Sequence, residues 1–281
     1  MTASRQGVAA ALRDATTRLG TPWARDEAEM LMAHALGTTR SAMLLNHLRD
    51  AAPSAFATML ARRLADEPVA HILGETEFYG RRFLVTPDVL IPRADSETTL
   101  VAALDAAPEA RRILDCGTGS GCLLLSLLAE RPAAIGIGID RSATALALAG
   151  RNAELLDIAD RVHLREADWT QTGWAAALGQ FDLVVANPPY VEIGAELDCA
   201  VRDHEPHEAL FAGHDGLDDY RVLIPQLPAL LAPGGTAVLE IGWRQAEAVT
   251  ALARDAGFAA ELRRDLAERP RALILVRDKP A

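Results

Sequence analysis

Four consecutive residues, Asn187-Pro188-Pro189-Tyr190, carry the groups needed to hold and activate a planar amide or amine. The nitrogen of such a group is a poor nucleophile because its lone pair is delocalised. The Asn187 side-chain oxygen and the Pro188 backbone oxygen can accept its two N–H bonds, and the prolines fix the local backbone. These acceptors stabilise the positive charge that grows on nitrogen during attack, and Tyr190 can pack against the planar group. We expect Asn187, Pro188 and Tyr190 to be catalytic and all four residues to bind the substrate that carries the amide or amine.

A second cluster is the segment Asp115-Cys-Gly-Thr-Gly-Ser-Gly121, which follows a predicted strand and opens a predicted helix. Glycines allow a tight turn and a close approach of backbone to ligand. Asp140 stands 19 residues after Gly121, at the end of the next predicted strand. A carboxylate in that position takes the two hydroxyls of a ribose. Loop and acid together predict a site for a nucleoside-type cofactor.

The residues around the glycine loop favour a cationic cofactor over a dinucleotide. The dinucleotide fingerprint needs Gly or Ala three residues after Gly119, where this chain has Cys122. Asp115 is a poor neighbour for a pyrophosphate, which needs positive potential. S-adenosylmethionine carries a ribose, an ammonium and a sulfonium but no phosphate, so the Coulomb interaction favours it. A single carboxylate does not settle this choice alone.

The elements that must position these groups alternate between strand and helix from residue 111 onward. Predicted strands end at Asp115, Asp140, about Asp168 and Ala186, with helices over about 120–130 and 142–156 between the first three. The last two predicted strands, 260–264 and 272–277, are too close for a crossover helix and must pair as an antiparallel hairpin. We therefore predict a doubly wound sheet whose glycine loop and Asn-Pro-Pro-Tyr loop share one crevice.

The earlier part of the chain has a different pattern. Residues 1–75 predict a small helical bundle without a catalytic cluster, residues 76–90 a β-hairpin linker, and residues 91–281 the catalytic domain. Within the last of these, Asp95 is expected near a helix N-cap and one helix is expected over 217–231. We expect the bundle to recognise a partner.

The 281 residues include 28 basic and 39 acidic side chains, a net charge of −11. Residues 1–75 carry eight of each sign, so the whole excess lies in 76–281. This acidity argues against a protein whose main partner is a nucleic-acid backbone. The first 20 residues show no export signal, and the apolar runs are too short to span a membrane. Three cysteines without a CxxC pair favour the reducing cytoplasm.

Histidines are expected to have structural roles. In His204-Glu205-Pro206-His207, Pro206 interrupts any helix and no cysteine is near, so the segment predicts a loop and no metal site. His34, His47 and His163 lie on predicted apolar faces and are expected to be packing residues.

The two motifs together resemble the amino-methyltransferases, and further segments narrow the resemblance to the HemK/PrmC type, the protein-(glutamine-N5) methyltransferases. These segments are Pro68–Gly74, Phe78–Gly80, Leu90–Arg93, Glu205-Pro206 with Ala209-Leu210, Asp215–Leu217 and Glu240–Gly242. The resemblance covers about residues 5–278.

The resemblance implies a Rossmann-like seven-stranded class I methyltransferase sheet with an antiparallel C-terminal hairpin and a small N-terminal all-α bundle. It implies methylation of the glutamine of the Gly-Gly-Gln motif in class 1 peptide chain release factors, with S-adenosyl-L-methionine, by a cytoplasmic monomer. Its bundle would help to dock the release factor. The expected cofactor contacts are Asp115, Gly117, Thr118, Gly119, Ser120, Gly121, Asp140, Asp168, Trp169 and Asn187, with Asp168 and Trp169 beside the adenine.

Three alternatives stay open. The same chemistry could act on a glutamine of a ribosomal protein, which sequence reasoning separates least well. The Asn-Pro-Pro-Tyr loop could instead hold the exocyclic amine of a flipped adenine, a reading that predicts a basic face. A non-catalytic module that binds the termination machinery would not need the two intact loops.

Overall fold

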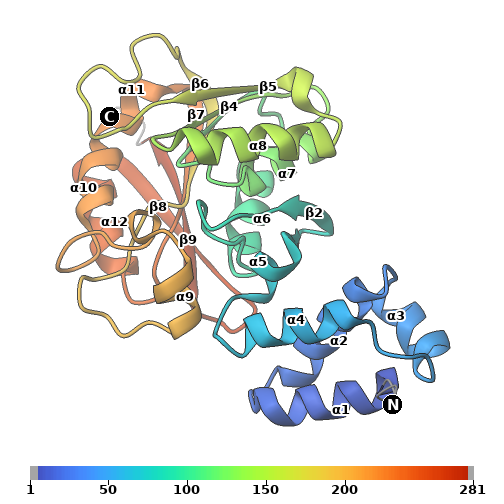
Figure 1. Cartoon of the computed structure of the whole chain (residues 1–281). Helices are drawn as coiled ribbons and strands as arrows, with labels where there is room; N and C mark the ends of the chain where they lie inside the picture. Colours follow the sequence, from blue (N-terminus) through green and yellow to red (C-terminus); the bar gives the residue numbers. More distant parts are fainter. Residues whose placement is uncertain (1–5, 278–281) are drawn as a thin grey trace. The chain divides into compact units, whose positions relative to one another are not determined.

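The computed structural model describes residues 6–277, so the outermost residues of the predicted first and last domains, 1–5 and 278–281, lie outside the described residues. The chain divides into two compact units. One comprises the residues up to Glu75 together with Leu197–His204, and the other comprises Thr76–Glu196 and the residues from Glu205 onward. Figure 1 colours both along the sequence.

The first unit is helical. Its elements are α1 (Val8–Leu19), α2 (Ala24–Ala35), α3 (Arg40–Ala42), a π-helical turn (Met43–His47), α4 (Ser54–Arg63), α5 (Val69–Leu73) and α9 (Cys199–His204). Buried side chains such as Val8, Leu31 and Phe56 form its core. The buried carboxylate of Glu29 accepts hydrogen bonds from Arg25 and Arg40 at 2.8 and 2.6 Å, which joins α2 to the turn that follows it.

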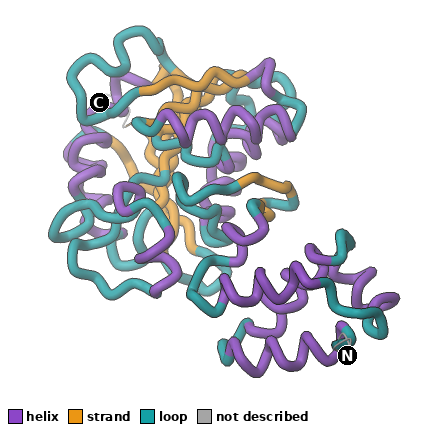
Figure 2. The backbone as a smooth tube through the Cα atoms, in the orientation of Figure 1, coloured by secondary structure: helices purple, strands orange, loops and turns teal. Residues whose placement is uncertain are grey.

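The second unit is built on a seven-stranded sheet with the order β5-β4-β3-β6-β7-β9-β8. Its strands are β3 (Arg112–Cys116), β4 (Ile135–Asp140), β5 (Val162–Glu166), β6 (Phe181–Ala186), β7 (Leu231–Glu240), β8 (Phe258–Arg264) and β9 (Pro270–Arg277). Strands β3 to β7 pair in parallel, and β9 runs antiparallel to both β7 and β8. Figure 2 shows the strands as one twisted layer with helices around it. The predicted doubly wound sheet with its terminal hairpin is confirmed.

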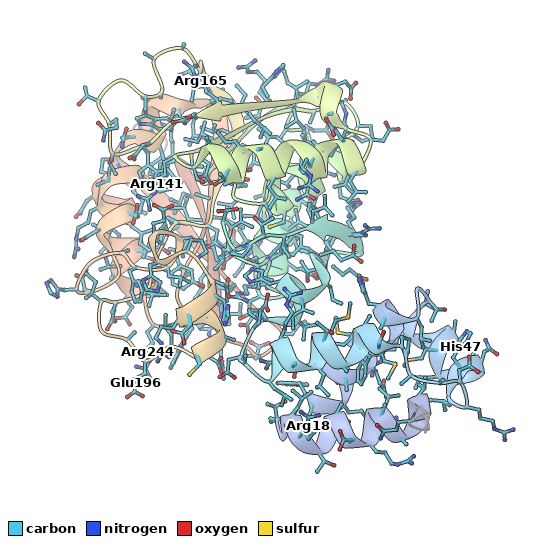
Figure 3. All side chains as sticks on the ribbon, in the orientation of Figure 1. Arg18, His47, Arg141, Arg165, Glu196 and Arg244 are labelled. Atoms are coloured by element: carbon cyan, nitrogen blue, oxygen red, sulfur yellow. The ribbon has the colours of Figure 1, made fainter. Side chains whose placement is uncertain are left out.

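Helices cover both faces of this sheet, and side chains fill the space between the layers (Figures 1 and 3). One face packs against α6 (Ser96–Ala106), α7 (Cys122–Glu130), α8 (Ala143–Leu155) and the hairpin of β1 (Glu75–Phe78) and β2 (Arg81–Leu84). The other packs against α10 (Asp218–Leu223), α11 (Leu227–Leu230) and α12 (Ala246–Asp255). Neighbouring residues alternate between the two cores: Ile113 faces the first and Leu114 the second. Strands buried on both faces explain the continuous apolar runs in the sequence.

One local expectation is wrong, and another is confirmed in position only. The helix expected over 217–231 is broken into α10, a 3₁₀ turn (Ile224–Gln226) and α11, because Pro225 and Pro228 lack the N–H that a continuous helix needs. Asp95 occupies the N-cap position of α6 as expected, but its side chain makes no capping hydrogen bond, since its own backbone is already helical (φ −60°, ψ −31°). Its carboxylate instead accepts a hydrogen bond from the almost buried Arg271 guanidinium at 2.8 Å.

Within residues 6–277, no helix has both the length and the apolar composition that a membrane crossing requires.

Candidate active site

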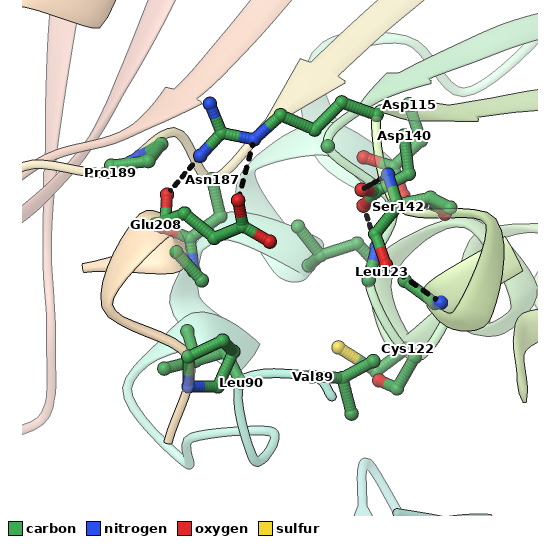
Figure 4. Close-up of a pocket in the computed structure, with 18 of the residues that line it drawn as sticks. Val89, Leu90, Asp115, Cys122, Leu123, Asp140, Ser142, Asn187, Pro189 and Glu208 are labelled. Atoms are coloured by element: carbon green, nitrogen blue, oxygen red, sulfur yellow. Dashed lines mark hydrogen bonds and ion pairs between the residues drawn. The ribbon is translucent and has the colours of Figure 1, made fainter. Parts of the chain in front are cut away.

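A cavity opens in the second unit at the carboxyl ends of β3, β4 and β6 (Figure 4), and it holds about 990 Å³ of free space including its open mouth. Ten residues that the sequence predicts to bind cofactor or substrate line it: Asp115, Gly117, Thr118, Gly119, Ser120, Asp140, Asp168, Trp169, Asn187 and Pro189. Gly121, Pro188 and Tyr190 lie outside the lining. The two predicted loops therefore do share one crevice, as the rule for open α/β sheets requires.

Hydrogen bonds attach the glycine loop to the end of β4. The amides of Gly117 and Thr118 both donate to the carbonyl oxygen of Ile139 at 2.9 Å. Gly119 has a positive φ of +54°, and a Cβ added there would meet no atom of the chain within 4 Å, so the cavity is open beside it. Gly121 serves a different purpose: its Cβ would stand 2.8 Å from Leu125, so this glycine lets the loop pack closely on α7. That packing accounts for its place outside the lining.

Asp115 lies at the bottom of the site with only 1 % of its surface exposed. Its Oδ2 accepts a hydrogen bond from Thr118 Oγ1 at 2.7 Å, whereas Oδ1 is buried without a hydrogen-bond partner among the described residues. Burial raises the pKa of Asp115 to about 7, and the hydrogen bond from Thr118 only partly opposes this rise. A buried, unpaired carboxylate oxygen is costly in a folded protein. Asp115 Oδ1 is therefore suited to accept a hydrogen bond from a cationic donor such as an ammonium group.

Asp140 is oriented by the loop it faces. Its Oδ2 accepts a hydrogen bond from the Gly119 amide and its Oδ1 one from the Ser142 amide, each at 2.9 Å. Burial raises the pKa of this carboxyl, and the two amide hydrogen bonds oppose the rise. Each oxygen keeps a second lone pair for a hydroxyl donor. This geometry suits the ribose-binding role that the sequence predicts for Asp140.

Trp169 covers the start of the glycine loop. A Cβ at Gly117 would lie 3.1 Å from the Trp169 ring, and the indole Nε1 donates to Asp219 Oδ1 at 3.0 Å. Asp168, beside it, accepts hydrogen bonds from the amide and the hydroxyl of Thr170 at 2.8 and 2.7 Å. Burial alone would raise the pKa of Asp168, but these bonds outweigh burial and lower it. Sequence reasoning missed Asp219, because only the fold brings it to Trp169 from 50 residues away.

The Asn-Pro-Pro-Tyr loop presents Asn187 to the cavity. The Asn187 side-chain amide has no hydrogen-bond partner in the described part of the chain, while the next residues are tied down. The amides of Tyr190 and Val191 both donate to the carbonyl oxygen of Leu210, at 3.1 and 2.8 Å. Burial raises the pKa of the Tyr190 phenol to about 12, so it stays neutral at physiological pH. Pro188 is buried behind the lining.

Two further segments line the cavity, Asp88–Arg93 and the three residues Pro206, Glu208 and Ala209, and sequence reasoning assigned neither a role in the site. Leu90–Arg93 and Glu205-Pro206 belong to the segments that carry the family resemblance, and this was the signal in the sequence that could have placed them in the site. Glu205 joins the two: its buried carboxylate accepts a hydrogen bond from the Ile91 amide at 3.0 Å and pairs with the Arg93 guanidinium. The structural role expected for this segment is confirmed, but only Glu205 and Pro206 lie in a loop, because His204 ends α9 and His207 opens a 3₁₀ turn (His207–Ala209). Among residues 6–277, no group of three or more His, Cys, Asp or Glu side chains is arranged to hold a metal ion.

The charge of the lining is negative. It contains six carboxylates and two arginines, and both arginines are already paired. Arg93 pairs with Glu205, and Arg141 donates to the Glu208 carbonyl at 2.7 Å and lies 3.5 Å from its carboxylate (Figure 4). Such a lining raises the local concentration of cations and repels a pyrophosphate.

The packing role expected for three histidines is wrong. His34 and His163 are exposed. His47 is half-buried at the surface of the helical unit (Figure 3), where its Nδ1 lies 2.8 Å from an Asp50 carboxylate oxygen. Apolar neighbours in the sequence did not place these polar rings in the core, because an exposed position avoids the cost of burying them.

Comparisons with known proteins identify the relatives of this chain. The model of the PrmC N-terminal domain matches residues 9–74, and that of the methyltransferase small domain matches residues 93–203. A protein of Cereibacter sphaeroides named release factor glutamine methyltransferase is 46% identical over 258 residues, which cover 89% of this chain and 90% of the relative. A protein of the same name from Caulobacter vibrioides is 43% identical and covers 90% of this chain and 89% of the relative.

Solved structures support the fold. A methyltransferase from Pyrococcus furiosus is similar with a TM-score of 0.52 at 15% identity, covering 78% of this chain and 98% of that one. The hMettl16 catalytic domain, solved in complex with an RNA hairpin, is similar with a TM-score of 0.57 at 15% identity, covering 74% and 80%. The second unit therefore has the class I methyltransferase fold.

Proposed function

We propose that this chain, which belongs to the family of release factor glutamine methyltransferases, methylates the side-chain N5 of the glutamine in the Gly-Gly-Gln motif of class 1 peptide chain release factors. One observation carries the proposal: a single cavity holds the unpaired Asn187 amide at one side and the buried, unpaired oxygen of Asp115 at another. The first can hold a planar amide, and the second can hold a cation. A methyltransferase for amides needs both.

The cofactor proposed is S-adenosyl-L-methionine, and the residues present fit it. Asp115 Oδ1 would accept the ammonium group, Asp140 the ribose hydroxyls, and Asp168 and Trp169 would border the adenine. The open space beside Gly119 leaves room for the ligand against the loop backbone. When bound, this cofactor supplies a methyl group on a sulfonium: the N–C bond forms as the C–S bond breaks, and the C–S electron pair stays on sulfur.

The chain's own contribution is alignment and polarisation of the glutamine amide. Asn187 Oδ1 and the Pro188 carbonyl oxygen would accept its two N–H bonds, so that the nitrogen lone pair points at the methyl group. Positive charge grows on nitrogen during attack, and these two acceptors stabilise it. The N-protonated product is very acidic and loses its proton to water, so no general base is needed. Tyr190 would pack beside the amide; its phenol is neutral at physiological pH, and burial, which raises its pKa from 10 to about 12, keeps it so and leaves it unable to take the proton.

Labelled S-adenosylmethionine tests this function directly. The enzyme is incubated with release factor, with release factor whose motif glutamine is changed, with ribosomal protein and with duplex DNA. We expect label only in the unchanged release factor. Label in DNA would support the adenine alternative, and label in a ribosomal protein the other glutamine target. Label that survives the glutamine change would contradict the proposed acceptor.

The first unit is proposed to dock the release factor, since its residues 9–74 match the PrmC N-terminal domain and no catalytic cluster was predicted in it. We also propose that the enzyme acts in the cytoplasm as a monomer and binds no nucleic acid stably. Light scattering of the enzyme with and without release factor tests whether the enzyme is a monomer. We expect one copy of the enzyme alone, and one copy of each chain in the complex.

A further inference from the structure

Gln245 joins three backbone segments that meet beside the Asn-Pro-Pro-Tyr loop. Its Nε2 donates to the carbonyl oxygens of Tyr190 at 3.0 Å and Gly216 at 3.1 Å. Its Oε1 accepts a hydrogen bond from the Gly242 amide at 3.1 Å. One half-buried side chain, at the start of α12, thus satisfies three backbone groups from separate parts of the chain.

The two glycines leave only enough room for this amide. A Cβ at Gly216 would stand 2.3 Å from the Tyr190 carbonyl oxygen and 2.6 Å from Gln245 Nε2. A Cβ at Gly242 would stand 2.6 Å from Gln245 Oε1 and 3.4 Å from Tyr190 Cδ2. Sequence analysis singled out the segments Asp215–Leu217 and Glu240–Gly242 without a role. Their glycines permit the close approach of Gln245 and Tyr190.

The peptide bond between Tyr190 and Val191 is held at both ends. Its carbonyl oxygen accepts the hydrogen bond from Gln245, and its N–H donates to the carbonyl oxygen of Leu210 at 2.8 Å. Asn187, three residues earlier, has no partner of its own in the described part of the chain. The position of its amide therefore depends on how firmly the end of the loop is held.

We propose that Gln245 is a positioning residue for methyl transfer, an inference that rests on the function proposed above. Gln245 does not line the cavity; it fixes the loop that presents Asn187 and Pro188. Catalysis that works by alignment is sensitive to displacements of about 1 Å, which can cost about 100-fold in rate. Losing the hydrogen bonds of Gln245 should therefore lower kcat much more than it changes cofactor binding.

The test compares three variants of the full chain. Gln245→Leu keeps the approximate volume and removes all three hydrogen bonds. Gly242→Ala places a Cβ 2.6 Å from Gln245 Oε1, so the Gln245 amide must shift, whereas the backbone is not strained because Gly242 does not have a positive φ. Glu247→Leu is the control: it changes an exposed residue in the first turn of α12, two residues after Gln245. For each we measure kcat, the KM values for release factor and cofactor, and amide hydrogen exchange of residues 187–193.

We expect kcat to fall about 10- to 100-fold in Gln245→Leu and Gly242→Ala, with the KM for cofactor within about twofold. Exchange at the Val191 amide should speed up in both variants and stay unchanged in Glu247→Leu. An unchanged kcat in Gln245→Leu, or an equal loss in Glu247→Leu, would overturn the proposal. If the wild-type enzyme does not methylate release factor, the proposed function fails, and exchange at Val191 still decides whether Gln245 holds this loop.

Discussion

At the scale of single residues, the site contains groups that lower stability in return for binding. Asp115 has a pKa of about 7 in the folded chain, against 3.8 as its ordinary value. The folded state therefore holds its proton more tightly than the unfolded chain does. Its unfavourable contribution begins near pH 4 and grows until the pH passes about 7, so the free energy of unfolding falls over that range. Burial also raises the pKa of Glu240 to about 7, so this carboxyl likewise lowers the free energy of unfolding as the pH rises.

Replacing Asp115 by Asn should stabilise the free enzyme at pH 8 and weaken its dependence on pH. The shift of Asp115 corresponds to on the order of 4 kcal/mol at that pH, which sets the upper limit of the gain. Urea unfolding at pH 5.5 and pH 8 measures the change, with Asp14→Asn on the exposed face of α1 as the control. The same variant should lose most of its affinity for S-adenosylmethionine by calorimetry. An unaltered pH dependence would show that Asp115 ionises normally.

Asn187 should matter for turnover and little for folding. Asn187→Ala removes one of two acceptors that stabilise developing charge, a loss worth about 100-fold or more in kcat. Its amide makes no hydrogen bond within residues 6–277, so the midpoint of urea unfolding should stay within experimental error of wild type. Initial rates with labelled cofactor measure the first effect, and Asn46→Ala at an exposed position is the matched control. A turnover near that of wild type would remove Asn187 from the mechanism.

At the scale of elements, α8 supports the glycine loop from behind through Asn152. This fully buried side chain accepts a hydrogen bond from the Leu84 amide at 2.7 Å and donates to the Leu84 and Ser120 carbonyl oxygens at 3.0 and 2.8 Å. Asn152 satisfies the backbone N–H and carbonyl of Leu84 at the end of β2, as a neighbouring strand would. It also connects β2 to the glycine loop.

Asn152→Ala should therefore destabilise the chain by about 2–4 kcal/mol, because three buried backbone groups lose their partner. Urea unfolding measures this, with Arg151→Ala, an exposed residue on the same helix, as the control. Saturating S-adenosylmethionine should restore part of the loss, since a ligand that binds only the folded state stabilises it. A cost no larger than that of Arg151→Ala would mean that solvent replaces these bonds.

The elements that local rules govern were predictable from sequence. Strands with continuous apolar runs, acids at their carboxyl ends and glycines at positive φ lie where the pattern placed them, so most of the cavity was foreseen. Long-range effects were not. Only the folded chain brings Asp219 to Trp169 and Glu205 to Ile91, and no spacing rule connects residues 50 or 114 positions apart. The broken helix at Pro225 is a local signal that sequence analysis did not use.

At the scale of the whole molecule, the charge is unevenly distributed. The net charge of −11 lies entirely in residues 76–281, and residues 205–219 of the second unit contain five carboxylates and no arginine. That stretch includes Glu208 and Asp219, which line the cavity. The rim of the site on this side therefore repels polyanions and attracts cationic surfaces, with a range of about 10 Å at moderate salt.

Duplex DNA should for this reason bind weakly, and lowering the salt concentration should not raise its affinity. A nucleic-acid enzyme gains affinity steeply as salt falls, because each phosphate contact releases counterions. An acidic enzyme shows the opposite trend, since repulsion is least screened at low salt. Fluorescence anisotropy of a labelled duplex at about 20 and 150 mM salt measures this, and we expect a Kd weaker than about 10⁻⁴ M at both. Micromolar binding that weakens steeply with salt would reveal a basic face that the charge pattern does not show, and would favour the adenine alternative over a protein substrate.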